Sequence, residues 1–122
     1  MRIVSLAAAI VLIAVPGGFA EAQEAHPLEP AFANTLLSTY PDGRTARLWL
    51  NRDGTYTSRS RRNRLSSGRW SLEGERVCMR QQRPFPGPFR YCTPLQRGGV
   101  GTRWSARGPT GEPIQVELVA GR

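Results

Sequence analysis

Short alternating stretches, separated by turn-forming residues at regular spacing, constrain the fold of this chain more than any other feature. Residues 40–44 contain Pro-Asp-Gly, and residues 51–54 repeat the Asp-Gly pair eleven residues later. Proline presets the second position of such a turn, and glycine adopts the positive φ that the turn requires. Strand-length runs bounded by turns of this kind are typical of an antiparallel β domain. The sequence therefore predicts an all-β fold.

Eight strands are predicted after residue 33, each five to eight residues long. They cover residues 34–40, 44–51, 55–60, 67–72, 76–81, 89–95, 102–106 and 113–119. Short connections favour an antiparallel meander, and the simplest closure of a meander is an up-and-down barrel or a strongly curled sheet. A two-sheet sandwich is the alternative.

The first residues have the composition of an export signal. Arg2 supplies the positive start, a mainly apolar run covers residues 3–15, and small residues then allow cleavage after Ala20 or Ala22. The run is shorter than the about 20 residues that span a bilayer. We expect a cleaved signal peptide over 1–22, no membrane span, and a protein that is periplasmic in a Gram-negative bacterium and secreted otherwise.

The remainder divides into two parts. Residues 23–33 are acidic and interrupted by proline, and they predict a flexible lead-in in which the single histidine, His26, is solvated. Residues 34–122 are long enough for one modest core and predict a single β domain.

Two cysteines, Cys78 and Cys92, fall in the predicted domain. In an exported protein an even pair is most simply a structural disulfide. A redox or metal pair is the alternative, but the thirteen intervening residues depart from the C-x-x-C spacing that both commonly use. Because the cysteines lie on neighbouring predicted strands, the bridge would tie together a hairpin with a proline-rich tip.

Positive charge is the strongest compositional bias. All seventeen basic residues are arginine, and nine acidic residues leave a formal charge of +8. The densest group, Arg59, Arg61, Arg62 and Arg64, is a candidate anion-binding loop. Guanidinium groups hold phosphates bidentately, so anionic lipid or lipopolysaccharide headgroups are expected partners. Nucleic acid is not favoured, because aromatic residues do not interleave with the arginines. The alternative explanation of the arginine excess is the codon usage of a GC-rich genome. The alternative to an anion-binding loop is a loop whose arginines are merely solvated.

A second candidate surface is the proline-rich hairpin tip that carries Phe85 and Phe89. These side chains could protrude into a partner protein or a membrane interface, or fold back as a lid on the barrel. A protruding tip would suit an envelope-associated interaction protein or a protease inhibitor.

The barrel interior is the third candidate. Its large side chains could line a pocket for a small apolar ligand, or fill the interior, which short strands favour. The candidate pocket or core residues are Trp49, Tyr56, Trp70, Met79 and Trp104. Alternation places Trp49 on the face opposite Leu48 and Leu50, so at least one of these apolar groups must face outward or bridge the two faces.

Catalytic patterns are not apparent. The carboxylates are dispersed through predicted turns, and the chain has neither a nucleophile motif nor a cluster of metal ligands. We expect a binding protein rather than an enzyme, with no metal and no cofactor.

The order of Asp53-Gly54-Thr55-Tyr56, Gly68-Arg69-Trp70 and Val77-Cys78 resembles a pattern in small exported lipocalin-like barrels. The resemblance covers about half of the predicted mature chain. It implies a small exported barrel that binds a ligand, without saying which ligand.

Overall fold

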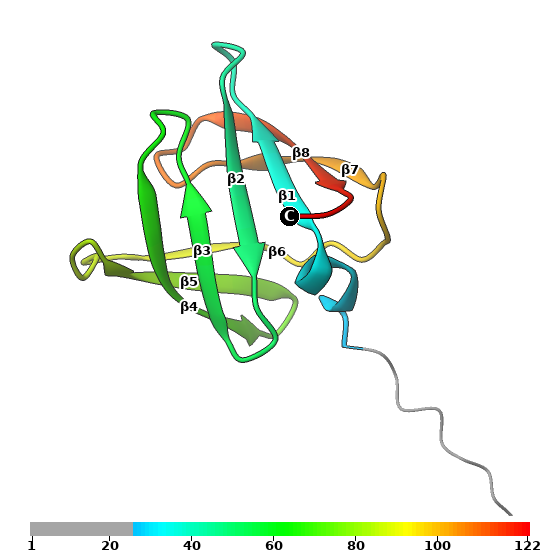
Figure 1. The fold of residues 1–122 in the computed structure, drawn as a ribbon, viewed down its shortest axis with the longest axis horizontal. Helices are drawn as coiled ribbons and strands as arrows, with labels where there is room; N and C mark the ends of the chain where they lie inside the picture. The colour runs from blue at the N-terminus through cyan, green and yellow to red at the C-terminus, as the bar shows by residue number, and fades with distance from the viewer. Residues whose placement is uncertain (1–25) are drawn as a thin grey trace, which may run out of the picture.

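The computed structural model describes residues 26–122, so the predicted signal peptide over 1–22 lies outside the described residues. A short 3-10 helix, η1 (Glu29–Ala33), precedes eight strands that form one antiparallel sheet (Figure 1). The strands are β1 (Thr35–Thr39), β2 (Thr45–Leu50), β3 (Thr55–Arg59), β4 (Leu65–Glu73), β5 (Arg76–Arg83), β6 (Arg90–Pro94), β7 (Arg103–Arg107) and β8 (Pro113–Val119). The predicted all-β meander is confirmed, and the ends of the strands differ from the predicted ends by two residues or fewer.

The sheet curls into a nearly closed barrel rather than dividing into a sandwich. Its strand order is β6-β5-β4-β3-β2-β1-β8-β7, so β1 pairs with β8 and the two edges belong to the consecutive strands β6 and β7. Across this gap the Tyr91 hydroxyl donates a hydrogen bond to the carbonyl of Arg107. Pro94 ends β6 without a backbone donor, and the long connection over 95–102 replaces a tight hairpin. We place the seam of the barrel here for these reasons.

The predicted disulfide is present and lies on neighbouring strands. Cys78 of β5 faces Cys92 of β6 in the ladder, with the two Cα atoms 4.0 Å apart. The bridge lies on the outer side of the sheet, where Arg90 pairs with Glu73 at 2.6 Å. Cys78 is nevertheless only 1% exposed. The disulfide therefore holds the edge strand β6 against the rest of the sheet.

The two ends of the barrel differ. The turns between β1 and β2, β3 and β4, β5 and β6, and β7 and β8 all lie at one end, toward the upper left of Figure 1. We call this end the mouth. The opposite end, which we call the closed end, carries η1, the connection over 95–102 and the C-terminus (Figure 1).

Residues 26–33 depart from the flexible lead-in predicted over 23–33, whose first three residues lie outside the described residues. Leu28 and Ala31 are buried and belong to the hydrophobic core, and η1 packs against β1 and β2. The His26 ring lies 5.2 Å from Phe32 and 5.7 Å from Trp70, so it is not a solvated linker residue. Pro27 and Pro30 interrupt this segment, so its sequence does not reveal the buried pair Leu28 and Ala31, which cover the closed end.

Within the described part of the chain, no helix has the length and apolarity needed to cross a membrane.

Candidate ligand-binding cavity

A cavity of about 790 Å³ occupies the mouth half of the barrel and opens to solvent. All eight strands contribute to its lining. Tyr40, Ser60, Phe89 and Pro109 bring each of the four mouth hairpins to its rim. A volume of this size falls within the range of pockets that bind small organic ligands. The interior is therefore not filled throughout, and the expectation of a filled interior is wrong for this half.

Four of the eight strands, β1, β2, β3 and β7, contribute to the hollow through a decrease in side-chain size toward the mouth. On β1 the inward residue changes from Leu36 to Ser38 toward the mouth, and on β2 it changes from Leu48 to Ala46. Strands β3 and β7 repeat the change, from Tyr56 to Ser58 and from Trp104 to Ala106. Successive inward positions on a strand are two residues apart, so each pair lies one layer apart in the barrel. On these four strands, large side chains fill one layer and small side chains leave space in the next layer.

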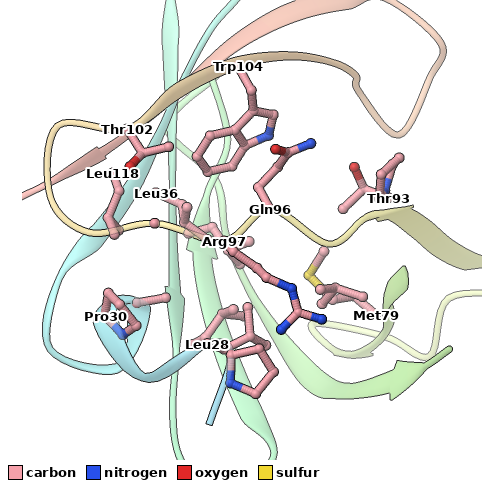
Figure 2. A pocket seen from close by; sticks show the side chains of 17 residues that line it. Leu28, Pro30, Leu36, Met79, Thr93, Gln96, Arg97, Thr102, Trp104 and Leu118 are labelled. Atoms are coloured by element: carbon pink, nitrogen blue, oxygen red, sulfur yellow. The ribbon is translucent and has the colours of Figure 1, made fainter. Parts of the chain in front are cut away.

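The closed half is packed and contains only a small pocket of about 60 Å³. In Figure 2, Leu28 and Pro30 of the N-terminal segment lie on one side of this pocket, and Trp104 lies across from them. The pocket and the large cavity share five lining residues: Leu36, Leu48, Met79, Thr93 and Trp104. These side chains form a floor that separates the two spaces.

The cavity lining is mainly apolar, with a few hydroxyl groups, and it also includes Gln81 and the arginines Arg47, Arg59 and Arg90. Ser58 and Ser66, which face each other on β3 and β4, share a hydrogen bond of 2.6 Å. Burial raises the pKa of Tyr40, Tyr56 and Tyr91, which all line the cavity. Burial disfavours the phenolate, so the tyrosines stay neutral and the lining offers a ligand apolar surface with hydroxyl donors.

Of the four predicted anion-binding arginines, Arg61 is already engaged by the protein. Its guanidinium contacts Glu112 at 3.0 Å and Asp42 at 3.5 Å, and its central carbon lies 4.3 Å from the centre of the Tyr40 ring. These contacts join three of the four mouth hairpins. We therefore assign Arg61 to the support of the mouth.

The other three arginines of that loop differ from Arg61. Arg59 donates a hydrogen bond to Asn63 at the turn. Arg62 and Arg64 are exposed, and within residues 26–122 neither forms an ion pair. The structure thus leaves two of the four predicted residues free to meet an anion.

The proline-rich tip between β5 and β6 lies at the rim of the cavity. Phe85 and Phe89 both line it, yet they are 63% and 84% exposed. A closed lid would bury these rings, so the lid interpretation does not describe this structure.

The large residues predicted for the interior are divided between several places. Tyr56, Met79 and Trp104 line the cavity. Trp70 packs at the closed end, where its indole donates a hydrogen bond to the Asn51 carbonyl at 2.8 Å. Trp49 takes the outer face, and its indole donates to the Thr35 hydroxyl at 2.9 Å.

Sequence reasoning missed the small residues that make the space. Ser38, Ala46, Ser58 and Ala106 create the hollow because they replace larger side chains in one layer. A comparison of side-chain size at alternate positions across all strands would have found them.

Within residues 26–122, one group of three potential metal ligands lies together: Glu73, Cys78 and Cys92. Both sulfur atoms of this group are joined in the disulfide. Because metal ligation by cysteine requires a thiolate, the oxidised group is not a metal centre.

Comparisons with protein-family models, with curated proteins and with solved structures find no match to this chain.

Proposed function

We propose that this protein binds a small, mainly apolar molecule in its barrel and acts as a carrier or binding module rather than as an enzyme. The observation that supports this most is the open cavity of about 790 Å³. A well-packed protein interior has few voids larger than a water molecule, so an open hollow of this size gives the small domain room for a small organic ligand in place of water.

The lining favours an amphipathic ligand. Apolar groups dominate the lining toward the floor, while the rim carries Tyr40 and the hydroxyl of Ser60. An apolar body would replace water along the walls, and a polar group of the ligand would remain near the mouth. This arrangement agrees in kind with the lipocalin-like resemblance, which we retain as part of the proposal.

We further propose that the protein is exported, to the periplasm of a Gram-negative bacterium or to the exterior otherwise. The signal-like sequence over 1–22 and the disulfide both support an oxidising destination. Secreted material should then begin at Glu21 or Gln23, which N-terminal analysis of the exported protein would reveal.

Fluorescence titration with anilinonaphthalene sulfonate, an aromatic probe with one anionic group, tests the cavity. Ala106→Phe places a ring in the hollow, and we expect it to weaken probe binding by about tenfold or more because it occupies the volume that the probe needs. The wild-type protein should bind the probe with enhanced emission.

Ser105→Phe is the matched control, because Ser105 neighbours Ala106 on β7 but is exposed. It adds the same ring on the outer side and should leave probe affinity within about twofold of the wild type. Equal affinity in both variants would place the probe elsewhere and remove the support for a cavity ligand.

A further inference from the structure

We propose that the mouth of the barrel docks on a bilayer containing anionic phospholipid, with the tip between β5 and β6 entering the interface. This inference rests on the outer surface of the mouth and not on the ligand in the cavity. Either proposal can therefore fail without the other.

Exposed apolar side chains gather at the mouth. Among residues 26–122 there are four exposed large hydrophobic residues, and Leu65, Phe85 and Phe89 lie at this end, with exposures of 60%, 63% and 84%. The fourth, Val100, lies on the connection at the closed end. A single exposed apolar residue needs no explanation, but a group at one end of a molecule marks an interaction site.

The phenylalanines are presented on a stiff support. Three prolines, Pro84, Pro86 and Pro88, alternate with other residues in the tip. Proline fixes φ, so the tip loses little conformational freedom when its rings become buried. The same rings stand at the rim of the cavity, so a bilayer that receives them would face its opening.

The mouth carries exposed positive charge that is not neutralised by ion pairs. Arg62, Arg64 and Arg83 are exposed there, and none of them forms an ion pair with a residue in the range 26–122. The acidic residues in the mouth turns, Asp42 and Glu112, are both paired with Arg61. An anion that approaches the mouth therefore meets arginines without a competing carboxylate.

The closed end has a different balance. Two exposed arginines there are paired, Arg52 with Glu29 and Arg97 with Glu75, and Arg103 pairs with Glu117 on the same half of the sheet. The exposed Arg76 and Arg122 also lie at this end and form no ion pair with a residue in the range 26–122. The two ends therefore differ mainly in apolar exposure: within residues 26–122, the mouth combines unpaired arginines with a group of exposed large apolar side chains, whereas the closed end has only one such side chain, Val100. Positive charge beside exposed aromatic rings is complementary to phosphate groups above an apolar layer.

A bilayer fits these observations better than a nucleic acid does. Single-stranded nucleic acid binds where aromatic rings stand along a basic groove and successive bases stack on them. Here both phenylalanines lie in one protruding tip, and the arginines of the 60–64 turn have no ring between them. Insertion of the tip into an interface uses the rings and the arginines together.

Co-sedimentation of the oxidised, mature-length protein with vesicles tests the proposal. We expect binding to vesicles of phosphatidylcholine mixed with phosphatidylglycerol and little binding to pure phosphatidylcholine. Binding should weaken strongly between about 0.1 M and about 1 M salt, because salt screens exposed charges. Phe85→Ala combined with Phe89→Ala should weaken binding by about tenfold or more, and so should Arg62→Ala combined with Arg83→Ala.

Two control variants carry the same kinds of change at the closed end. Val100→Ala removes an exposed apolar group there, and Arg97→Ala combined with Arg103→Ala removes two exposed arginines. Both should bind vesicles within about twofold of the wild type. Equal losses in the mouth and control arginine variants would show attraction by net charge alone and overturn the proposal.

Two further results would also overturn it. One is the same affinity for neutral and anionic vesicles. The other is binding to single-stranded DNA without binding to anionic vesicles, which would assign the basic surface to nucleic acid. Anilinonaphthalene sulfonate binding by the Arg62→Ala and Arg83→Ala variant reports on the cavity separately, since neither arginine lines the cavity, whereas Phe85 and Phe89 do.

Discussion

Among single residues, Arg61 makes the connections that hold the mouth in shape. Its guanidinium reaches Asp42 on one hairpin and Glu112 on another, and it stacks on the ring of Tyr40. Isolated surface ion pairs contribute less than about 1 kcal/mol. Ordering the Arg61 side chain costs conformational entropy once, although the side chain contacts two carboxylates and a ring. Separate ion pairs would each require another arginine to be ordered, so this group holds the three loops together at a lower entropic cost.

This group makes the stability of the protein depend on pH. The pKa of Glu112 lies below its ordinary value of 4.5, first because the Thr110 hydroxyl donates a hydrogen bond to it, and also because Arg61 lies beside it. A carboxyl with a lowered pKa in the folded protein stabilises the fold above its unfolded pKa, and this contribution is lost as the pH falls through the folded value. We expect the Tm to fall as the pH drops below about 4.5.

The variant Glu112→Gln isolates this contribution. It should lower the Tm at neutral pH and reduce the fall of the Tm in acid, since the amide that replaces the carboxyl does not titrate. Glu29 and Asp53, whose pKa values are also lowered, would retain their share of the acid dependence. Thermal melts that show the wild-type pH profile in Glu112→Gln would contradict the assignment.

Gly68 on β4 is the residue with the tightest backbone contact. A Cβ atom added there would lie 2.0 Å from the carbonyl oxygen of Arg80, where the ladder between β4 and β5 shifts its register. Because backbone must move to relieve this contact, we expect Gly68→Ala to lower the free energy of unfolding by about 3 kcal/mol.

Gly99→Ala is the control for that change, because its added Cβ would meet nothing within 4 Å. Its effect should stay within about 0.5 kcal/mol. Urea denaturation of both variants would measure the difference, and similar values would mean that the close approach at Gly68 is easily relieved.

Among the elements, the hairpin of β5 and β6 combines several structural features. It forms one edge of the sheet, carries the exposed tip at the mouth and ends beside the seam. The Cys78–Cys92 bridge and the ion pair between Arg90 and Glu73 hold it to the barrel. An edge strand without a second neighbour depends on such links, because it has hydrogen bonds to one side only.

The disulfide should therefore contribute strongly to stability. Closing a loop with a sequence separation of 14 is worth about 3 kcal/mol in the chain-entropy treatment. We expect Cys78→Ala combined with Cys92→Ala to lose about this free energy of unfolding, measured in urea. Reduction should destabilise the wild type by a similar amount and leave the double variant unchanged. A double variant as stable as the oxidised wild type would contradict this role.

The strands were predictable from the sequence, whereas their closure was not. Turn residues and alternation located all eight strands, and residues 113–119 were predicted at the bounds of β8. Alternation describes one strand at a time, so it does not say which two strands form the edges of the sheet. That choice depends on Pro94 and on the length of the connection after it, which permit a gap between β6 and β7.

The candidate site was predictable only in part for the same reason. Tyr56, Met79 and Trp104 were recognised as inward residues, but the hollow depends on Ser38 and Ala106, which signal nothing by themselves. The pairing of Arg61 with Glu112 joins residues 51 positions apart, so sequence proximity grouped Arg61 with its neighbours instead. Contacts between distant segments decide both features.

At the scale of the whole molecule, the cavity and three of the four exposed large apolar side chains of residues 26–122 lie at one end. The opposite end is closed by η1 and by the apolar core, and it carries the ion pairs of Arg52 with Glu29 and of Arg97 with Glu75. A barrel organised in this way has one route for a ligand, through the mouth. We propose that the same end both receives the ligand and meets the surface from which it comes.

Native mass spectrometry after incubation with a total lipid extract tests the central claim most directly. We expect the wild-type protein to retain a dissociable mass of roughly a few hundred daltons, in keeping with a ligand that fits the cavity. Ala106→Phe should lose this mass, and Ser105→Phe should keep it. A wild-type spectrum that contains only the bare polypeptide, under conditions in which the disulfide is intact, would contradict the proposal that this barrel carries a ligand.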